Sequence, residues 1–149
     1  MRPGIRRMLA HTAGLVLLTS GITLGTVSTA SAASGCPGSL VGTYYLKQTN
    51  GTVMSTARVY YSSANGGTNC VTNTAGLYYG KVTQLSATIE RNNLTGRKSD
   101  MGDYRYYAGP VTVTGTNGRC INIDVSASNG PSSGHTIIWQ RAWYNIHCG

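Results

Sequence analysis

Residues 81–91 read Lys-Val-Thr-Gln-Leu-Ser-Ala-Thr-Ile-Glu-Arg, and the alternation in this stretch decides the fold. Leu85, Ala87 and Ile89 fall on one face of an extended strand, and the residues between them are polar. A period of two is typical of an antiparallel sheet with one buried face. The same alternation recurs in residues 119–126. These two stretches predict strands whose apolar faces point into a common core.

Further runs rich in Thr, Val, Tyr and Ile extend this pattern along the chain. Asn-Gly dipeptides, which favour tight turns, separate several of them, and Asn50-Gly51 is a good hairpin candidate. About seven strands predict an all-β fold, either an antiparallel sandwich or a small barrel. The strands are expected near residues 41–48, 52–61, 68–74, 81–91, 103–115, 119–126 and 136–147.

Residues 1–32 have the pattern of a secretion signal peptide. Arginines near the start precede an apolar stretch over 9–27, and Ala30-Ser31-Ala32 fits the small-x-small cleavage pattern. Glycine, serine and threonine within the stretch disfavour the alternative, a membrane-spanning helix. Arg6-Arg7 matches a twin-arginine signal only weakly, so we expect the general secretory route. Cleavage would leave residues 33–149 as one secreted domain without a stable membrane anchor.

All four cysteines follow the predicted signal peptide. An even number of cysteines in an exported chain indicates disulfides, and four cysteines allow three connectivities. We predict the pairs Cys36–Cys70 and Cys120–Cys148, because each closes a local loop of about 30 residues. The alternative is a zinc site, but no Cys-x-x-Cys spacing occurs, so we predict no bound metal.

The chain is basic, with a formal net charge of +8. Removal of the three signal-peptide arginines leaves nine Lys and Arg residues against four Asp and Glu residues. Arg97-Lys98 is the only adjacent basic pair outside the signal, and no polybasic stripe predicts nucleic-acid binding. The charge instead predicts weak attraction to anionic cell-wall polymers.

Tyrosine is unusually frequent, with ten residues against no phenylalanine. Four doublets occur, and within a strand each would direct one ring to the core and one outward. Outward rings can bind sugars or a partner, whereas cross-strand pairing would only stabilise the sheet. The doublets are Tyr44-Tyr45, Tyr60-Tyr61, Tyr78-Tyr79 and Tyr106-Tyr107.

The last predicted strand places two tryptophans and an arginine on the same face. This face is either a binding platform with a cation–π contact or a part of the core. The full candidate binding surface consists of Trp139, Arg141, Trp143, Tyr107, Arg97 and Lys98.

Catalytic signals are weak, and we predict no enzyme and no cofactor. Asp100 and Asp103 could be paired carboxylates for glycoside hydrolysis, but their loop-like setting favours turn and cap roles. No His-Glu-x-x-His motif is present. Other acid–base candidates, which no spacing brings together, are His135, His147, Glu90 and Arg141.

Residues 106–111 read Tyr-Tyr-Ala-Gly-Pro-Val, and Gly109-Pro110 predicts a structural corner at a sheet edge or bulge. This string is the strongest match in a resemblance to the spore-associated protein A family. The resemblance covers most of residues 33–149 with all four cysteines in order. One departure is Asn122-Ile123-Asp124-Val125, where the family typically has a Trp-Gly-Gly-like segment. The other matching segments are residues 57–61, 67–71, 120–121 and 147–149.

The resemblance implies a small secreted protein of sporulating filamentous bacteria, found with the spore or cell surface. The resemblance implies no catalytic activity, and it assigns no functional residues to this chain. We therefore predict a secreted, surface-associated structural protein without catalysis, with a glycan-binding module or a protein inhibitor as the alternative. An exposed aromatic strip would favour glycan binding, and a long ordered loop beside a disulfide would favour inhibition.

Overall fold

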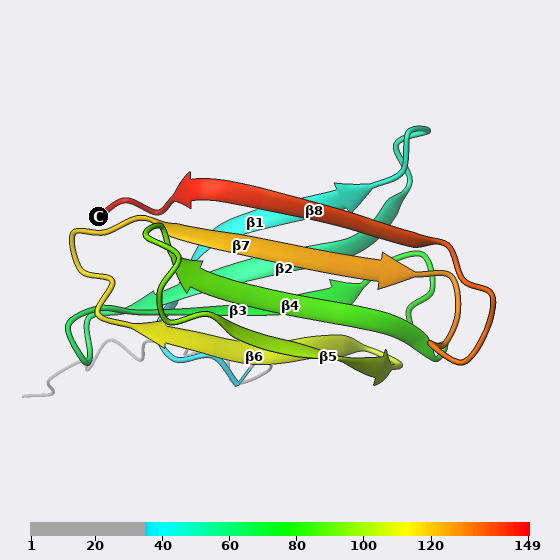
Figure 1. The fold of residues 1–149 in the computed structure, drawn as a ribbon, viewed down its shortest axis with the longest axis horizontal. Coiled ribbons are helices and arrows are strands. Elements are labelled where there is room, and N and C mark those ends of the chain that lie inside the picture. Colours follow the sequence, from blue (N-terminus) through cyan, green and yellow to red (C-terminus); the bar gives the residue numbers. More distant parts are fainter. Residues whose placement is uncertain (1–34) are drawn as a thin grey trace, which may run out of the picture.

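Two four-stranded antiparallel sheets pack face to face in the computed structural model, which describes residues 35–149 (Figure 1). The described part contains no helix, so the predicted all-β fold is confirmed as a sandwich. The predicted signal peptide, residues 1–32, lies outside the described residues. The strands are β1 (Ser39–Lys47), β2 (Val53–Ser62), β3 (Thr68–Ala75), β4 (Thr83–Arg91), β5 (Lys98–Tyr104), β6 (Tyr107–Thr114), β7 (Ile121–Ser128) and β8 (Ile138–Ile146).

The strand order is β1-β2-β3-β6 in the first sheet and β5-β4-β7-β8 in the second. The predicted hairpin at Asn50-Gly51 joins β1 to β2. Gly51 has a φ of +87° in this turn, and the Asn50 side chain accepts a hydrogen bond from the Thr52 N–H at 3.0 Å. Glycine adopts this φ without steric cost, which is why the dipeptide is a strong turn signal.

The core lies between the sheets and is built from the apolar half of each alternating strand. Leu85, Ala87 and Ile89 of β4 are fully buried, as the period-two pattern predicted. Val125 and Ile123 of β7 lie opposite Ala87 and Ile89 and are buried beside them. The polar half of the same strands therefore forms the outer face of the second sheet.

The two long sides of the sandwich are closed by different contacts. On one side, β5 and β6 lie together across a tight turn, although they belong to different sheets (Figure 1). There the Asp100 carboxylate of β5 accepts a hydrogen bond from the Gly109 N–H of β6 at 2.6 Å. On the other side, the ring centroids of Tyr44 on β1 and Trp143 on β8 are 5.2 Å apart.

The prediction of one strand over residues 103–115 was wrong. The chain turns at residues 105–106, and residues 98–104, which include the stretch around Asp100 and Asp103 that we expected to be loop-like, form β5. β5 is an edge strand with polar residues on both faces, so it has no apolar alternation to reveal it. Asp100 and Asp103 accordingly lie in a strand, and turn and cap roles do not apply to them.

Gly109-Pro110 lies within β6, at the edge of the first sheet, where a proline without an N–H is tolerated. The peptide bond is cis, Gly109 has a φ of +91°, and the partner strand shifts register between Val71 and Asn73. The expected edge-and-bulge position is confirmed, but the segment is a bend inside a strand and not a corner between strands.

Both predicted disulfides are present. Cys36–Cys70 fastens the segment before β1 to β3, and Cys120–Cys148 fastens the segment after β8 to the start of β7. Each bridge therefore connects parts of one sheet, and two such bridges are consistent with an extracellular protein. Within residues 35–149, no helix is long and apolar enough to cross a membrane.

Asn73 of β3 connects the two sheets through the core. Its side-chain amide is fully buried and donates to the backbone carbonyls of Ser86 on β4 and Ser126 on β7, at 2.8 and 2.9 Å. This single side chain therefore links the first sheet to both central strands of the second sheet by hydrogen bonds made inside the core.

Candidate functional site

The outer face of the sheet β5-β4-β7-β8 is hollowed along its two central strands. Ser86, Thr88 and Ser126 point outward, yet they are only 7, 5 and 8 % exposed. Longer side chains on the flanking strands shield them, including Met101 and Tyr144. We call this hollow the polar groove, and its floor consists of Ser86, Thr88, Glu90, Asn122, Asp124 and Ser126.

The strand register aligns the floor of the polar groove in rows. Ser86 lies directly opposite Ser126, and Thr88 lies opposite Asp124. The two serine hydroxyls are 2.6 Å apart, and the Ser126 N–H donates to the Ser86 Oγ at 3.1 Å. Because these side chains are short, the groove is deep at its middle. The part of the groove around Ser86 and Ser126 has a volume of about 590 Å³ and is partly open to solvent.

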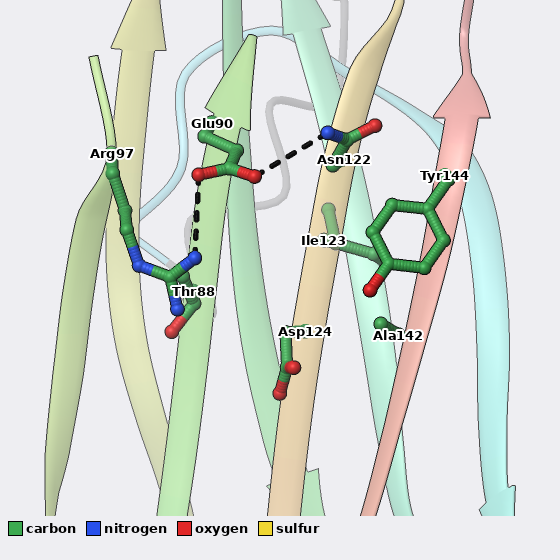
Figure 2. Close-up of a pocket in the computed structure, with 8 residues that line it drawn as sticks. All are labelled: Thr88, Glu90, Arg97, Asn122, Ile123, Asp124, Ala142 and Tyr144. Carbon is green, nitrogen blue, oxygen red and sulfur yellow. Dashed lines mark hydrogen bonds and ion pairs between the residues drawn. The ribbon is translucent and has the colours of Figure 1, made fainter. Parts of the chain in front are cut away.

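Acidic groups gather at the other end of the polar groove, where the space is about 260 Å³ (Figure 2). The buried Glu90 carboxylate accepts from Arg97 and from the Asn122 amide, both at 3.3 Å. Figure 2 shows the Tyr144 ring of β8 on the other side of β7 from Glu90. Both oxygens of Asp124 accept from the Gln140 amide nitrogen at 2.9 Å.

Three of the chain's four acidic residues lie on this outer face, although the chain carries a net charge of +8. Besides Glu90 and Asp124, Asp103 lies beside Gln84 and accepts two hydrogen bonds from Ser132. The fourth, Asp100, points inward, where its hydrogen bond raises the pKa of Tyr104 together with burial of that ring. The outer face is therefore rich in hydrogen-bond acceptors and unfavourable to polyanions.

The six residues of the predicted binding surface do not form one surface. Arg97 lines the polar groove in an ion pair with Glu90, whereas Tyr107 is exposed on β6 of the other sheet. Lys98 is exposed at the start of β5, in register with the inward-facing Ile89. The prediction of a joint surface is corrected, because these residues stand on different faces.

The aromatic face of β8 belongs mainly to the core side of its sheet. Trp139 and Trp143 lie opposite inward-facing residues of β7 and pack against the core. Arg141 points the same way but is exposed at the sheet edge, and its guanidinium lies 5.2 Å from the Trp143 ring centroid. The two tryptophans therefore belong to the core, which was one of the two predicted interpretations. The predicted cation–π contact is present between Arg141 and Trp143.

The acid–base candidates are also separated. Asp100 and Asp103 lie an odd number of residues apart in β5 and face opposite sides of the sheet. His135 precedes β8 and His147 follows it, so the length of that strand, about 3.4 Å per residue, stands between the two imidazoles.

His147 is positioned by Tyr44, whose hydroxyl lies 3.0 Å from its Nε2. Partial burial lowers the pKa of His147 from its usual 6.5. The unfolded chain therefore binds this proton more readily, so the contribution of His147 to stability is complete above about pH 6.5 and decreases as the pH falls toward the folded pKa. We expect the urea midpoint to drop between about pH 8 and about pH 5, and His147→Gln to reduce that drop. Equal pH slopes for the two proteins would contradict this assignment.

Glu90 and Arg97 were functional candidates from the sequence, but the other groove residues were not. The sequence did contain a signal for the groove. At the outward-facing positions of the stretches 81–91 and 119–126, Ser, Thr, Asn and Asp occur in place of longer side chains. Among residues 35–149, no group of three His, Cys, Asp or Glu side chains is arranged to hold a metal. Comparison with protein-family models, curated proteins and solved structures finds no match to this chain. We therefore infer function from the chemistry of the groove.

Proposed function

We propose that the protein is a secreted, non-catalytic protein that associates with a cell or spore envelope by binding neutral polysaccharide in the polar groove. The observation that carries this proposal is the low floor of small polar side chains between taller flanking side chains. A concave site with convergent polar groups is the usual form of a ligand-binding site.

The groove offers the groups that a sugar chain needs. Sugar hydroxyls are donors and acceptors, and they would meet the Asp124 carboxylate, the Thr88 hydroxyl and the Gln140 amide. The exposed ring of Tyr144 supplies an apolar surface for a sugar face at one end of the groove. Because the groove follows the strands, an extended polymer can occupy it lengthwise.

The acidic character of the groove favours a neutral polymer. Asp124 and Glu90 would repel carboxylate or phosphate groups, while they can accept hydrogen bonds from neutral hydroxyls. Both carboxylates already accept hydrogen bonds from neighbouring side chains, which supports a binding role over proton transfer. The predicted signal peptide and the resemblance to spore-associated proteins support an envelope location.

The protein-inhibitor alternative receives less support. The longest connection between described strands, residues 129–137, follows the end of β7, whereas Cys120–Cys148 lies at its start. The length of β7 therefore separates this loop from the disulfide that could have locked it.

The test is retention of residues 33–149 on insoluble cellulose, chitin, cell-wall and spore fractions. Thr88 lines both ends of the groove, so Thr88→Trp should obstruct it and lower the bound fraction about tenfold. Tyr144→Ala should weaken retention by about two- to tenfold, the range for loss of one aromatic contact.

The matched control is Thr56→Trp, on the outer face of β2 in the other sheet, which should bind as the unmodified protein does. Unfolding temperatures would confirm that each variant is folded. If no fraction retains the protein, or if Thr88→Trp binds as well as Thr56→Trp, the groove is not a polysaccharide site.

A further inference from the structure

Two of the tyrosine doublets meet outside the polar groove. Tyr79, in the connection from β3 to β4, and Tyr106, in the turn from β5 to β6, have ring centroids 5.1 Å apart and an interplanar angle of 56°. Their side chains remain 60 and 49 % exposed. We call Tyr79, Tyr106 and the adjacent Arg105 the tyrosine platform. It lies at the end of the sandwich where β4 begins and β5 ends (Figure 1).

Backbone hydrogen bonds hold the tyrosine platform in place. The Gly80 N–H donates to the Arg105 carbonyl at 2.8 Å, and the Ala75 N–H donates to the Tyr106 carbonyl at 2.8 Å. The Arg105 guanidinium donates back to the Gly80 carbonyl at 3.3 Å. The two rings are thus positioned before any ligand arrives, which reduces the entropy lost on binding.

The charge of the tyrosine platform is opposite to that of the polar groove. Neither Arg105 nor the nearby Lys81 forms an ion pair with any residue of the described range 35–149. The two closest carboxylates in the sequence are engaged elsewhere, Asp100 with Tyr104 and Gly109, and Asp103 with Ser132. Arg105 therefore retains unused N–H donors next to two exposed rings.

An open hollow of about 550 Å³ adjoins this arginine. It is lined by Tyr104, Arg105, Tyr106, Tyr107 and Gly109, so three tyrosines and one arginine border the same space. Aromatic faces accept the apolar faces of sugar rings, and the planar guanidinium matches a carboxylate with two hydrogen bonds.

We propose that the tyrosine platform is a second binding site, separate from the polar groove, for an acidic polysaccharide whose sugar rings carry carboxylates. The paired rings of Tyr79 and Tyr106 favour a ligand that contains sugar rings. The Arg105 guanidinium favours an anionic group on or next to those sugar rings. A linear glycerol-phosphate polymer supplies the anion without the ring, so it fits the platform less well than a polyuronate. The groove and the platform would then bind chemically different polymers from one domain.

The experiment measures binding of residues 33–149 to polygalacturonate and to its fully methyl-esterified form, at low salt. Unmodified protein should bind the acid and bind the neutral ester much more weakly. Tyr79→Ala and Tyr106→Ala should each weaken binding of the acid about two- to tenfold. Arg105→Gln should abolish the preference for the acid over the ester, because it removes the charge and leaves the rings.

Tyr45→Ala is the matched control, since Tyr45 is similarly exposed and its ring lies 5.6 Å from the Lys47 ammonium, with no second ring stacked on it among residues 35–149. It should leave binding unchanged, as should Thr88→Trp in the polar groove. The proposal is overturned if polygalacturonate is not bound, if Tyr45→Ala weakens binding as much as Tyr79→Ala, or if glycerol-phosphate teichoic acid is bound equally well. The two proposals can fail independently. If the groove does not bind neutral polymers, binding of polygalacturonate to the platform can still be measured, because Thr88→Trp changes no platform residue.

Discussion

A variant with Cys36→Ala and Cys70→Ala is expected to lose about 2–5 kcal/mol of unfolding free energy. The bridge constrains a loop with a sequence separation of 34 in the unfolded chain. It is also part of a packed cluster, because Cys36 and Cys70 are only 8 and 0 % exposed and contact the buried Tyr60. The variant therefore loses both the chain constraint and buried contacts. Urea unfolding monitored by circular dichroism would measure the change.

Removal of the second bridge is the control for this prediction. Cys120–Cys148 has a sequence separation of 28, so its effect on the unfolded chain is nearly the same. Cys148 is exposed, however, and replacing both cysteines by alanine removes little packing. We expect a smaller loss of stability than for the first bridge. An equal or larger loss would show that the Tyr60 cluster contributes nothing beyond the covalent link.

Replacement of Asn73 by leucine is expected to destabilise the fold by about 1–3 kcal/mol, because it removes two buried hydrogen bonds. Their acceptors are the carbonyls of Ser86 and Ser126 in the centre of the second sheet. The loss arises from these missing hydrogen bonds, since leucine and asparagine have similar shapes. The free energy of unfolding in urea is again the measurement.

Asn69 provides a matched control on the same strand. It is as deeply buried as Asn73, but its amide nitrogen has no hydrogen-bond partner among the described residues. Asn69→Leu therefore leaves no new unpaired carbonyl and should change stability little or increase it. If the two leucine variants were equally destabilised, the effect would come from side-chain shape and not from the hydrogen bonds of Asn73.

Most of the fold could be predicted from residues whose structural role depends on the sequence immediately around them. The period-two alternation in residues 81–91 and 119–126 identified β4 and β7, since each strand has one dry face. The Asn50-Gly51 turn located the first hairpin, and local loop closure selected the correct disulfide pairs. The assignment to the spore-associated protein A family stays a prediction.

The remaining features depend on contacts between distant segments. β5 is polar on both faces, and only its pairing with β4 and its contact with β6 reveal it as a strand. The groove depends on which strands flank Ser86 and Ser126, and local pattern does not specify strand order. Likewise, Tyr79 and Tyr106 stand in separate turns, and only the folded chain brings their rings together.

The placement of the two disulfides determines how the domain would respond to a force that pulls its two ends apart. Tension applied at Cys36 passes directly to Cys70 in β3, and tension at Cys148 passes directly to Cys120 before β7. The β1–β2 hairpin and β8 are thereby bypassed and carry no load. Only residues 70–120 can lengthen under force, by at most about 3.6 Å per residue. A domain of this construction would stretch by a limited amount and retain the strand β8 that borders its groove.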